Sequence, residues 1–131
     1  MTWDRSLYPN NWKQIAHGVK QEVNWCCEEC GRPCRKPGER ERDLFQRLPA
    51  AWLNDWYKIV DSEEFGEVEI EVPTRFVLTV AHLDHRPENC DRDNLKALCS
   101  VCHLAYDTTP SARFQKQQVK AERAGQLLLP V

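Results

Sequence analysis

The sequence predicts a single α+β domain, and three observations support that prediction. Apolar residues recur at helical spacing over 12–23, polar and apolar residues alternate strictly over 67–72, and C-x-x-C pairs begin at Cys27 and Cys99. A chain of 131 residues is long enough for one ordinary domain and too short for two. With 41% hydrophobic and 29% charged residues, the composition is typical of a globular protein. We therefore expect residues 1–131 to form one unit.

The N-terminal part, residues 1–24, is expected to contain an amphipathic helix. Its apolar stripe consists of Trp12, Ile15, Ala16, Val19 and Val23. Asn10 or Asn11 can cap the start of this helix, directly after the helix-excluding Pro9. Residues 25–38 then form a turn-rich knuckle, in which a glycine at position 31 suits a tight turn.

Residues 39–66 are predicted to be a helical insertion that ends in an acidic turn. Apolar residues on both sides of Pro49 suit a helix, and the proline interrupts it. The helix is expected to resume through Trp52, Trp56 and Ile59, and to give way to a turn over 61–66.

Residues 67–107 are predicted to form the centre of the domain. The alternating residues 67–72 suit a half-buried strand, and residues 75–83 suit a second, more apolar strand. A polar loop over 86–94 then leads to a short strand or turn, which is followed by a helix that opens at the second cysteine pair and runs to about Tyr106.

The last part, residues 108–131, is expected to be a helix and a short tail. Pro110 suits the first helical position, with Thr109 as the N-cap. Gly125 suits the C-cap.

The cysteine pattern predicts a structural zinc site. The expected ligands are Cys27, Cys30, Cys99 and Cys102. Four thiolates in two C-x-x-C pairs are the ligand set of a closed tetrahedral zinc site. The pairs are separated by residues 31–98, and the entropic cost of closing such a loop grows only as the logarithm of its length. Cys26, Cys34 and Cys90 are expected to be free thiols, although Cys34 could substitute for a ligand.

Histidines and polar residues cluster around the second cysteine pair. The cluster consists of His82, Asp84, His85, Asn94 and His103. If a zinc ion fixes the start of the helix, the end of the preceding strand can face that helix, and the imidazole rings converge. Imidazole and carboxylate suit a borderline divalent ion, and an unligated histidine suits a general base near pH 7. We therefore expect a second, catalytic metal site here.

The order of these motifs, with the upstream C-x-x-C-Gly, resembles the HNH endonuclease family. The similarity is to its small zinc-stapled phage and bacterial members, which have a treble-clef-like ββα-metal core. It covers residues 8–34 and 76–107, and it does not extend to 39–75. The resemblance implies a hydrolase that cuts phosphodiester bonds of DNA. In that family a histidine deprotonates water, and one divalent ion stabilises the charge that develops on the phosphoryl group.

The family's roles fit this sequence in two registers. In the favoured register His82 is the base, and His85 and His103 bind the catalytic ion, which is Mg²⁺, Mn²⁺, Ni²⁺ or Zn²⁺. Asp84 is then the reserve ligand. In the other register, Asp84 and His85 are the ligand and the base. Asn94 would orient the base or brace the loop through side-chain hydrogen bonds.

Double-stranded DNA is the expected partner. The net charge of −2 gives no general basic field, so phosphate contacts must be local. The expected contacts are Arg113, Lys116, Lys120 and Arg32. Another protein or subunit could bind through residues 39–75. The alternative function is a non-catalytic zinc module that binds nucleic acid or protein, because such a module needs the cysteines but not the histidines.

The N-terminus lacks the charged and apolar regions of a signal peptide. No apolar run approaches the ~20 residues of a membrane span. We therefore expect a cytoplasmic protein with no membrane partner, and the resemblance implies a bacterium or a phage-infected cell as its source.

Overall fold

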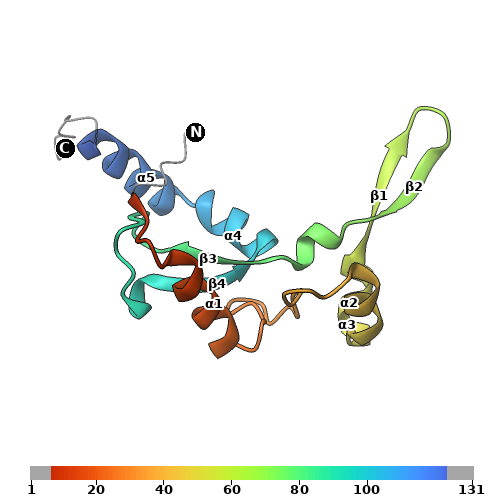
Figure 1. The fold of residues 1–131 in the computed structure, drawn as a ribbon. Helices are drawn as coiled ribbons and strands as arrows, with labels where there is room; N and C mark the ends of the chain where they lie inside the picture. The colour runs from red at the N-terminus through yellow and green to blue at the C-terminus, as the bar shows by residue number, and fades with distance from the viewer. Residues whose placement is uncertain (1–6, 124–131) are drawn as a thin grey trace.

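A computed structural model describes residues 7–123, which form an α+β fold with two lobes (Figure 1). The first lobe holds α1 (Trp12–Glu22), β3 (Leu78–His82), β4 (Leu95–Cys99), α4 (Ser100–Asp107) and α5 (Pro110–Arg123). The second lobe holds α2 (Glu41–Arg47), α3 (Ala50–Leu53), β1 (Tyr57–Ser62) and β2 (Gly66–Glu71). Each of the two sheets consists of two antiparallel strands. None of the helices in the described part of the chain is long and apolar enough to cross a membrane.

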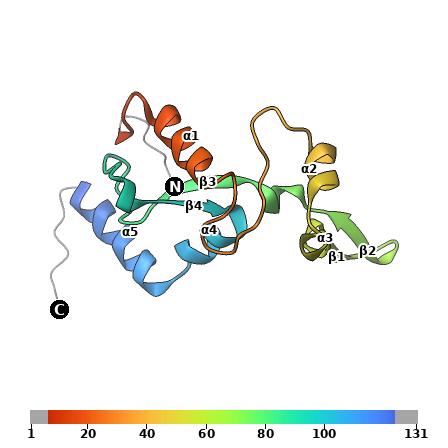
Figure 2. The same cartoon turned by 90° about the horizontal axis from the view of Figure 1, so that it is seen from below.

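The hairpin of β3 and β4 is the centre of the first lobe. Its register pairs Leu78 with Cys99 and His82 with Leu95. Helices α1 and α4 lie on opposite sides of this hairpin, and both contact its two strands (Figure 2). The core between them includes Val19, Leu78, Ala81, Leu95, Ala97 and Leu98. Packing on both sides therefore fixes the end of β3 and the start of α4 relative to each other.

The second lobe has a small core of its own, formed by Leu44, Leu48, Trp56 and Phe76. Helix α2 ends at the extended residue Leu48, because the proline that follows disfavours a helical conformation there. The interruption predicted at Pro49 is thus confirmed. Phe76 is fully buried two positions before β3, so it anchors the second lobe beside the first.

The acidic hairpin of β1 and β2 corrects the sequence prediction. The sequence predicts a helix up to residue 60 and a turn over 61–66, whereas β1 occupies positions 57–62 and pairs along its whole length with β2. Tyr57, Ile59 and Val60 are aromatic or β-branched, and such residues favour a strand once a partner strand is present. Five of the six residues of β2 are exposed, so this strand is not half-buried, and it belongs to the second lobe.

The remaining expected elements are present. Asn11 is the N-cap residue of α1, but its side chain makes no capping hydrogen bond. The segment from Leu95 is a true strand, and α4 follows it directly. Thr109 Oγ1 accepts a hydrogen bond from the backbone N–H of Ala112 at 3.2 Å, which is the N-cap predicted for α5. The predicted C-cap at Gly125 lies outside the described residues.

Candidate functional site

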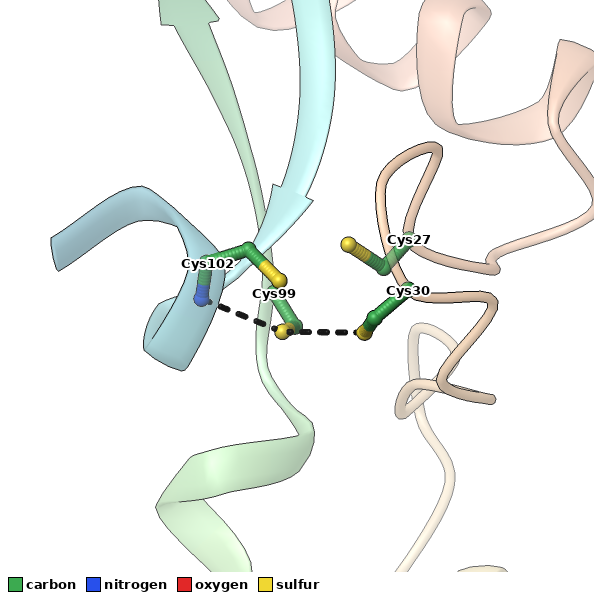
Figure 3. Close-up of side chains that lie close together, drawn as sticks. All are labelled: Cys27, Cys30, Cys99 and Cys102. Carbon is green, nitrogen blue, oxygen red and sulfur yellow. Dashed lines mark hydrogen bonds between the residues drawn. The ribbon is translucent and has the colours of Figure 1, made fainter. Parts of the chain in front are cut away.

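Four cysteines from two distant segments meet beside the hairpin of the first lobe (Figure 3). The Sγ atoms of Cys27, Cys30, Cys99 and Cys102 all lie within 4.8 Å of one another. Those of Cys30 and Cys99 are 3.8 Å apart, well beyond the length of a disulfide bond. A tetrahedral zinc ion with Zn–S bonds of about 2.3 Å separates its ligands by about 3.8 Å. These cysteines could therefore hold a metal ion such as zinc.

Local backbone geometry aims the cysteines at one point. Gly31 has φ +79°, and its N–H donates to the carbonyl of Cys27 at 2.9 Å, which closes the tight turn of the knuckle. On the other side, the N–H of Cys102 donates to Sγ of Cys99 at 3.4 Å at the start of α4. Burial raises the pKa of the Cys27 thiol, but backbone hydrogen bonds from Cys30, Cys99 and position 29 outweigh it and lower the pKa to about 7. The backbone thus favours the thiolate at Cys27, whereas burial raises the pKa of the Cys30 thiol.

Glu28 fastens the knuckle to β4. Its N–H donates to the carbonyl of Ala97 at 2.9 Å, and its Oε2 accepts the N–H of Ala97 at 2.7 Å. Arg92 adds an ion pair with Glu28 at 3.3 Å. These bonds hold the two cysteine pairs in register.

Arg32 lies inside the protein, which corrects the expectation that it contacts DNA. Its guanidinium carbon is 4.9 Å from the ring centroids of both Trp52 and Phe76, and its side chain is 7% exposed. Burial lowers the pKa of Arg32, but the charges of Cys99 and Asp55 outweigh it and raise the pKa. Its Nε and Nη1 have no hydrogen-bond partner. Arg32 therefore places positive charge beside the thiolates and joins them to the second lobe.

The other cysteines lie outside the cluster. Cys34 is fully buried, and its Sγ donates to the carbonyl of Arg32 at 3.4 Å. Burial raises the pKa of this thiol to about 12, which disfavours the thiolate. Cys26 and Cys90 are partly exposed free thiols, as the sequence predicts.

His82 is the last residue of β3 and is 9% exposed. Its ring centroid lies 4.7 Å from that of Trp12 and 5.7 Å from that of Tyr8. Its Nε2 is 3.8 Å from Sγ of Cys90. Burial lowers the pKa of His82, so the ring is neutral near pH 7, the protonation state that a general base needs.

His85 combines an unusual backbone with an unpaired ring nitrogen. Its φ is +58°, and its ring stacks on Tyr106 with a centroid distance of 5.7 Å. Nε2 is buried and has no hydrogen-bond partner, an arrangement that costs about 1–3 kcal/mol. Burial lowers the pKa of His85. The charge of Asp107 raises this pKa and that of Lys116 lowers it, and the net shift is downward. A buried nitrogen without a partner fits an atom that receives a ligand.

His103 lies on the first turns of α4, and each of its ring nitrogens lies near an oxygen atom of another residue. Its Nδ1 is 2.8 Å from Oγ1 of Thr79, and that hydroxyl donates its proton to the carbonyl of Leu98 at 2.8 Å. In the tautomer that fits this contact, Nδ1 is therefore the donor and the lone pair is on Nε2. Nε2 is 3.6 Å from Oδ2 of Asp107. Asp107 is not among the site residues predicted from the sequence, although its i, i+4 spacing from His103 on a helix is a signal for it.

Asp84 and Asn94 brace the loop between β3 and β4. Oδ1 of Asp84 accepts from the N–H of Arg86 and from Nδ2 of Asn94, both at 2.9 Å, and its Oδ2 accepts from Nδ2 of Asn89 at 2.8 Å. Oδ1 of Asn94 accepts the N–H of Asp84 at 3.0 Å, and Nδ2 also donates to the carbonyl of Asn89 at 2.9 Å. Asn94 thus makes the bracing contacts that the sequence predicts. Both oxygens of Asp84 are already engaged within the loop.

The structure does not bring the predicted catalytic ligands into one tight cluster. Within the described part of the chain, the four cysteines alone form a group of three or more candidate ligands with atoms within 4.8 Å of one another. His85, His103 and Asp84 do not meet that distance. The catalytic ion therefore stays a prediction.

The basic residues expected to contact DNA from α5 differ in their surroundings. Arg113 and Lys120 are exposed. Lys116 is partly buried, with Nζ 3.7 Å from Oδ2 of Asp107. Of these residues, Lys116 places positive charge near His85.

Comparison of the chain with protein-family models, with curated proteins and with solved structures gives no match. A function for this protein therefore has to be argued from its residues and their arrangement.

Proposed function

We propose that the protein is a metal-dependent endonuclease of the HNH type, which hydrolyses phosphodiester bonds of DNA. The observation that supports it best is the unit of β3, β4 and α4, whose helix starts at the four-cysteine site. This unit carries His82 at a strand end, His85 in the loop and His103 on the helix. That order matches the resemblance in residues 76–107, and a structural zinc site alone does not require it.

His85 and His103 are proposed to hold the catalytic ion, which would act as a Lewis acid on the phosphate. The unpaired Nε2 of His85 and the lone pair on Nε2 of His103 support this assignment. Asp107 is the better candidate for a third ligand, because the oxygens of Asp84 are occupied by the loop.

His82 is proposed as the base that takes a proton from water, and His85 is the competing candidate. The lowered pKa of His82 supports the required neutral ring. Its tilted ring contact with Trp12 would hold the ring in one orientation. If His85→Ala abolishes cleavage without loss of metal while His82→Ala leaves it intact, the two roles are reversed.

The phosphate backbone is proposed to contact Arg113 and Lys120, which are exposed on α5. The acidic hairpin suits a different partner, because Ile59 and Phe65 are 65% and 75% exposed among carboxylates. We propose that a protein or subunit with a basic surface binds there.

The test is conversion of supercoiled plasmid to nicked or linear DNA by zinc-loaded protein. Mg²⁺, Mn²⁺, Ni²⁺ and Zn²⁺ are added separately, and we expect conversion with at least one of them. No conversion with any of the four ions would reject the nuclease. That result, together with retained binding of DNA or a protein, would favour the non-catalytic zinc module.

A further inference from the structure

An open groove of about 470 Å³ lies between α1 and the C-terminal part of the knuckle, residues 35–38. Its basic lining residues are Lys13, His17, Lys20, Arg35 and Lys36. The indole rings of Trp12 and Trp25 also line it, and no carboxylate does. Such a lining is unusual in a chain whose net charge is −2. The groove is therefore a local site of positive potential.

Within residues 7–122, no basic residue that lines this groove forms an ion pair. The ion pairs of residues 7–122 involve Arg32, Arg40, Arg47, Arg86, Arg92, Lys96, His103 and Lys116. None of these residues lines the groove. The neighbouring carboxylate of Glu39 is held by Arg47, with contacts of 2.6 and 2.8 Å. An anionic ligand would therefore meet basic groups that form no ion pair among residues 7–122, and of these Lys36 also feels the charge of Glu39.

A strained turn holds one aromatic wall of the groove. Asn24 and Trp25 have φ of +55° and +58°, a region that costs a residue with a side chain about 1–2 kcal/mol. The turn brings the Trp25 ring to 5.4 Å from the ring of His17 and 5.9 Å from Nζ of Lys20. The indole is thus fixed among basic groups, where strain of this kind often accompanies function.

The other aromatic wall connects the groove to the proposed histidine site, which consists of His82, His85 and His103. Trp12 lines the groove, and its ring is 4.7 Å from that of His82. A chain bound in the groove would therefore lie next to the end of β3.

We propose that this groove binds a single-stranded segment of nucleic acid. Its phosphates would contact Lys13, Arg35 and Lys36, and a base would lie against an indole ring. Basic grooves with aromatic platforms bind single strands, because unstacked bases gain from stacking and duplex bases cannot reach the rings. The choice of nucleic acid among polyanions rests on the proposed nuclease function. The groove would hold a strand that leaves the duplex near the histidine site.

The test is the affinity for a fluorescent ten-nucleotide oligothymidylate, measured by anisotropy between 50 and 200 mM salt. Zinc-loaded protein is used without added divalent ions, so that binding is separated from cleavage. The double variant Lys13→Ala/Lys36→Ala is compared with Arg42→Ala/Lys58→Ala, which removes the same charge from exposed sites of the second lobe. Melting temperatures of both variants verify that they fold.

Loss of two phosphate contacts should make the negative slope of log affinity against log salt less steep by about 1.4. With equal affinities at about 1 M salt, this corresponds to about a sixtyfold weaker affinity at 50 mM salt. The control should stay within about twofold of the wild type, because distant exposed charges are screened. Equal loss in both double variants, or none in the groove variant, would overturn the proposal. Tighter binding of a duplex with the same dependence on the groove would overturn the single-strand assignment. Binding as expected without plasmid cleavage would leave the groove standing and reject the nuclease.

Discussion

Replacing Cys30 with serine should destabilise the protein through the loss of one metal ligand. Cys30 is exposed, so the substitution itself leaves the core intact. It lies 69 positions from Cys99, and bringing together the two ends of a segment of that length costs about 4.4 kcal/mol of loop-closure entropy at 25 °C. Metal coordination offsets that cost in the native state. Without the metal, packing and the polar contacts of Glu28 with Ala97 and Arg92 have to hold the two cysteine pairs together.

The expected change in melting temperature follows from the size of the chain. For 131 residues, an unfolding entropy of about 2.1 cal/mol/K per residue converts 4.4 kcal/mol into about 16 °C. Calorimetry of the wild type and of Cys30→Ser measures this difference, and elemental analysis gives the zinc content. A chelator added to the wild type should lower its melting temperature to a similar extent.

Cys26→Ser is the matched control, because Cys26 lies next to the cluster in sequence and outside it in space. Its Sγ makes one hydrogen bond, to the carbonyl of Asn24 at 3.4 Å, so a shift below about 4 °C is expected. Equal melting temperatures for the two variants, with no response of the wild type to a chelator, would refute the reasoning.

Three further predictions concern the loop between β3 and β4, the pH dependence of stability, and Arg32 beside the cysteines. Asn94→Ala removes three hydrogen bonds that brace the loop and should cost about 1–3 kcal/mol in chemical denaturation, whereas exposed Asn54→Ala should cost almost nothing. Burial lowers the pKa of His82 below its ordinary 6.5, so the stabilisation present above pH 6.5 is lost as the pH falls towards the folded-state pKa. His82→Gln should therefore flatten the melting temperature against pH below 6.5, and an unchanged slope would contradict this. Arg32→Met should weaken zinc binding about 10- to 100-fold in competition with a chelating dye, with Arg40→Met as the exposed control.

The features that the sequence predicts correctly depend on local patterns. The two-residue spacer of each C-x-x-C pair is itself the geometric requirement for shared coordination, so the four-cysteine cluster could be predicted. Helix interruption at Pro49 and the N-cap at Thr109 likewise follow from neighbouring residues alone.

The features that the sequence missed depend on contacts between distant segments. Ile59 fits both a helical stripe and a strand, and only pairing with β2 decides between them. Arg32 resembles a surface residue until the second lobe places Trp52 and Phe76 against its guanidinium. The tilted ring contact between Trp12 and His82 joins α1 to the end of β3, and no local pattern indicates it.

The rate of plasmid nicking tests the central claim most directly. Wild-type protein is compared with His85→Ala/His103→Ala and with the control Thr108→Ala, an exposed substitution just after α4. We predict a divalent-ion-dependent rate for the wild type and the control, and a rate at least about a hundredfold lower for the double variant. Nicking by the folded double variant at the wild-type rate would contradict the account.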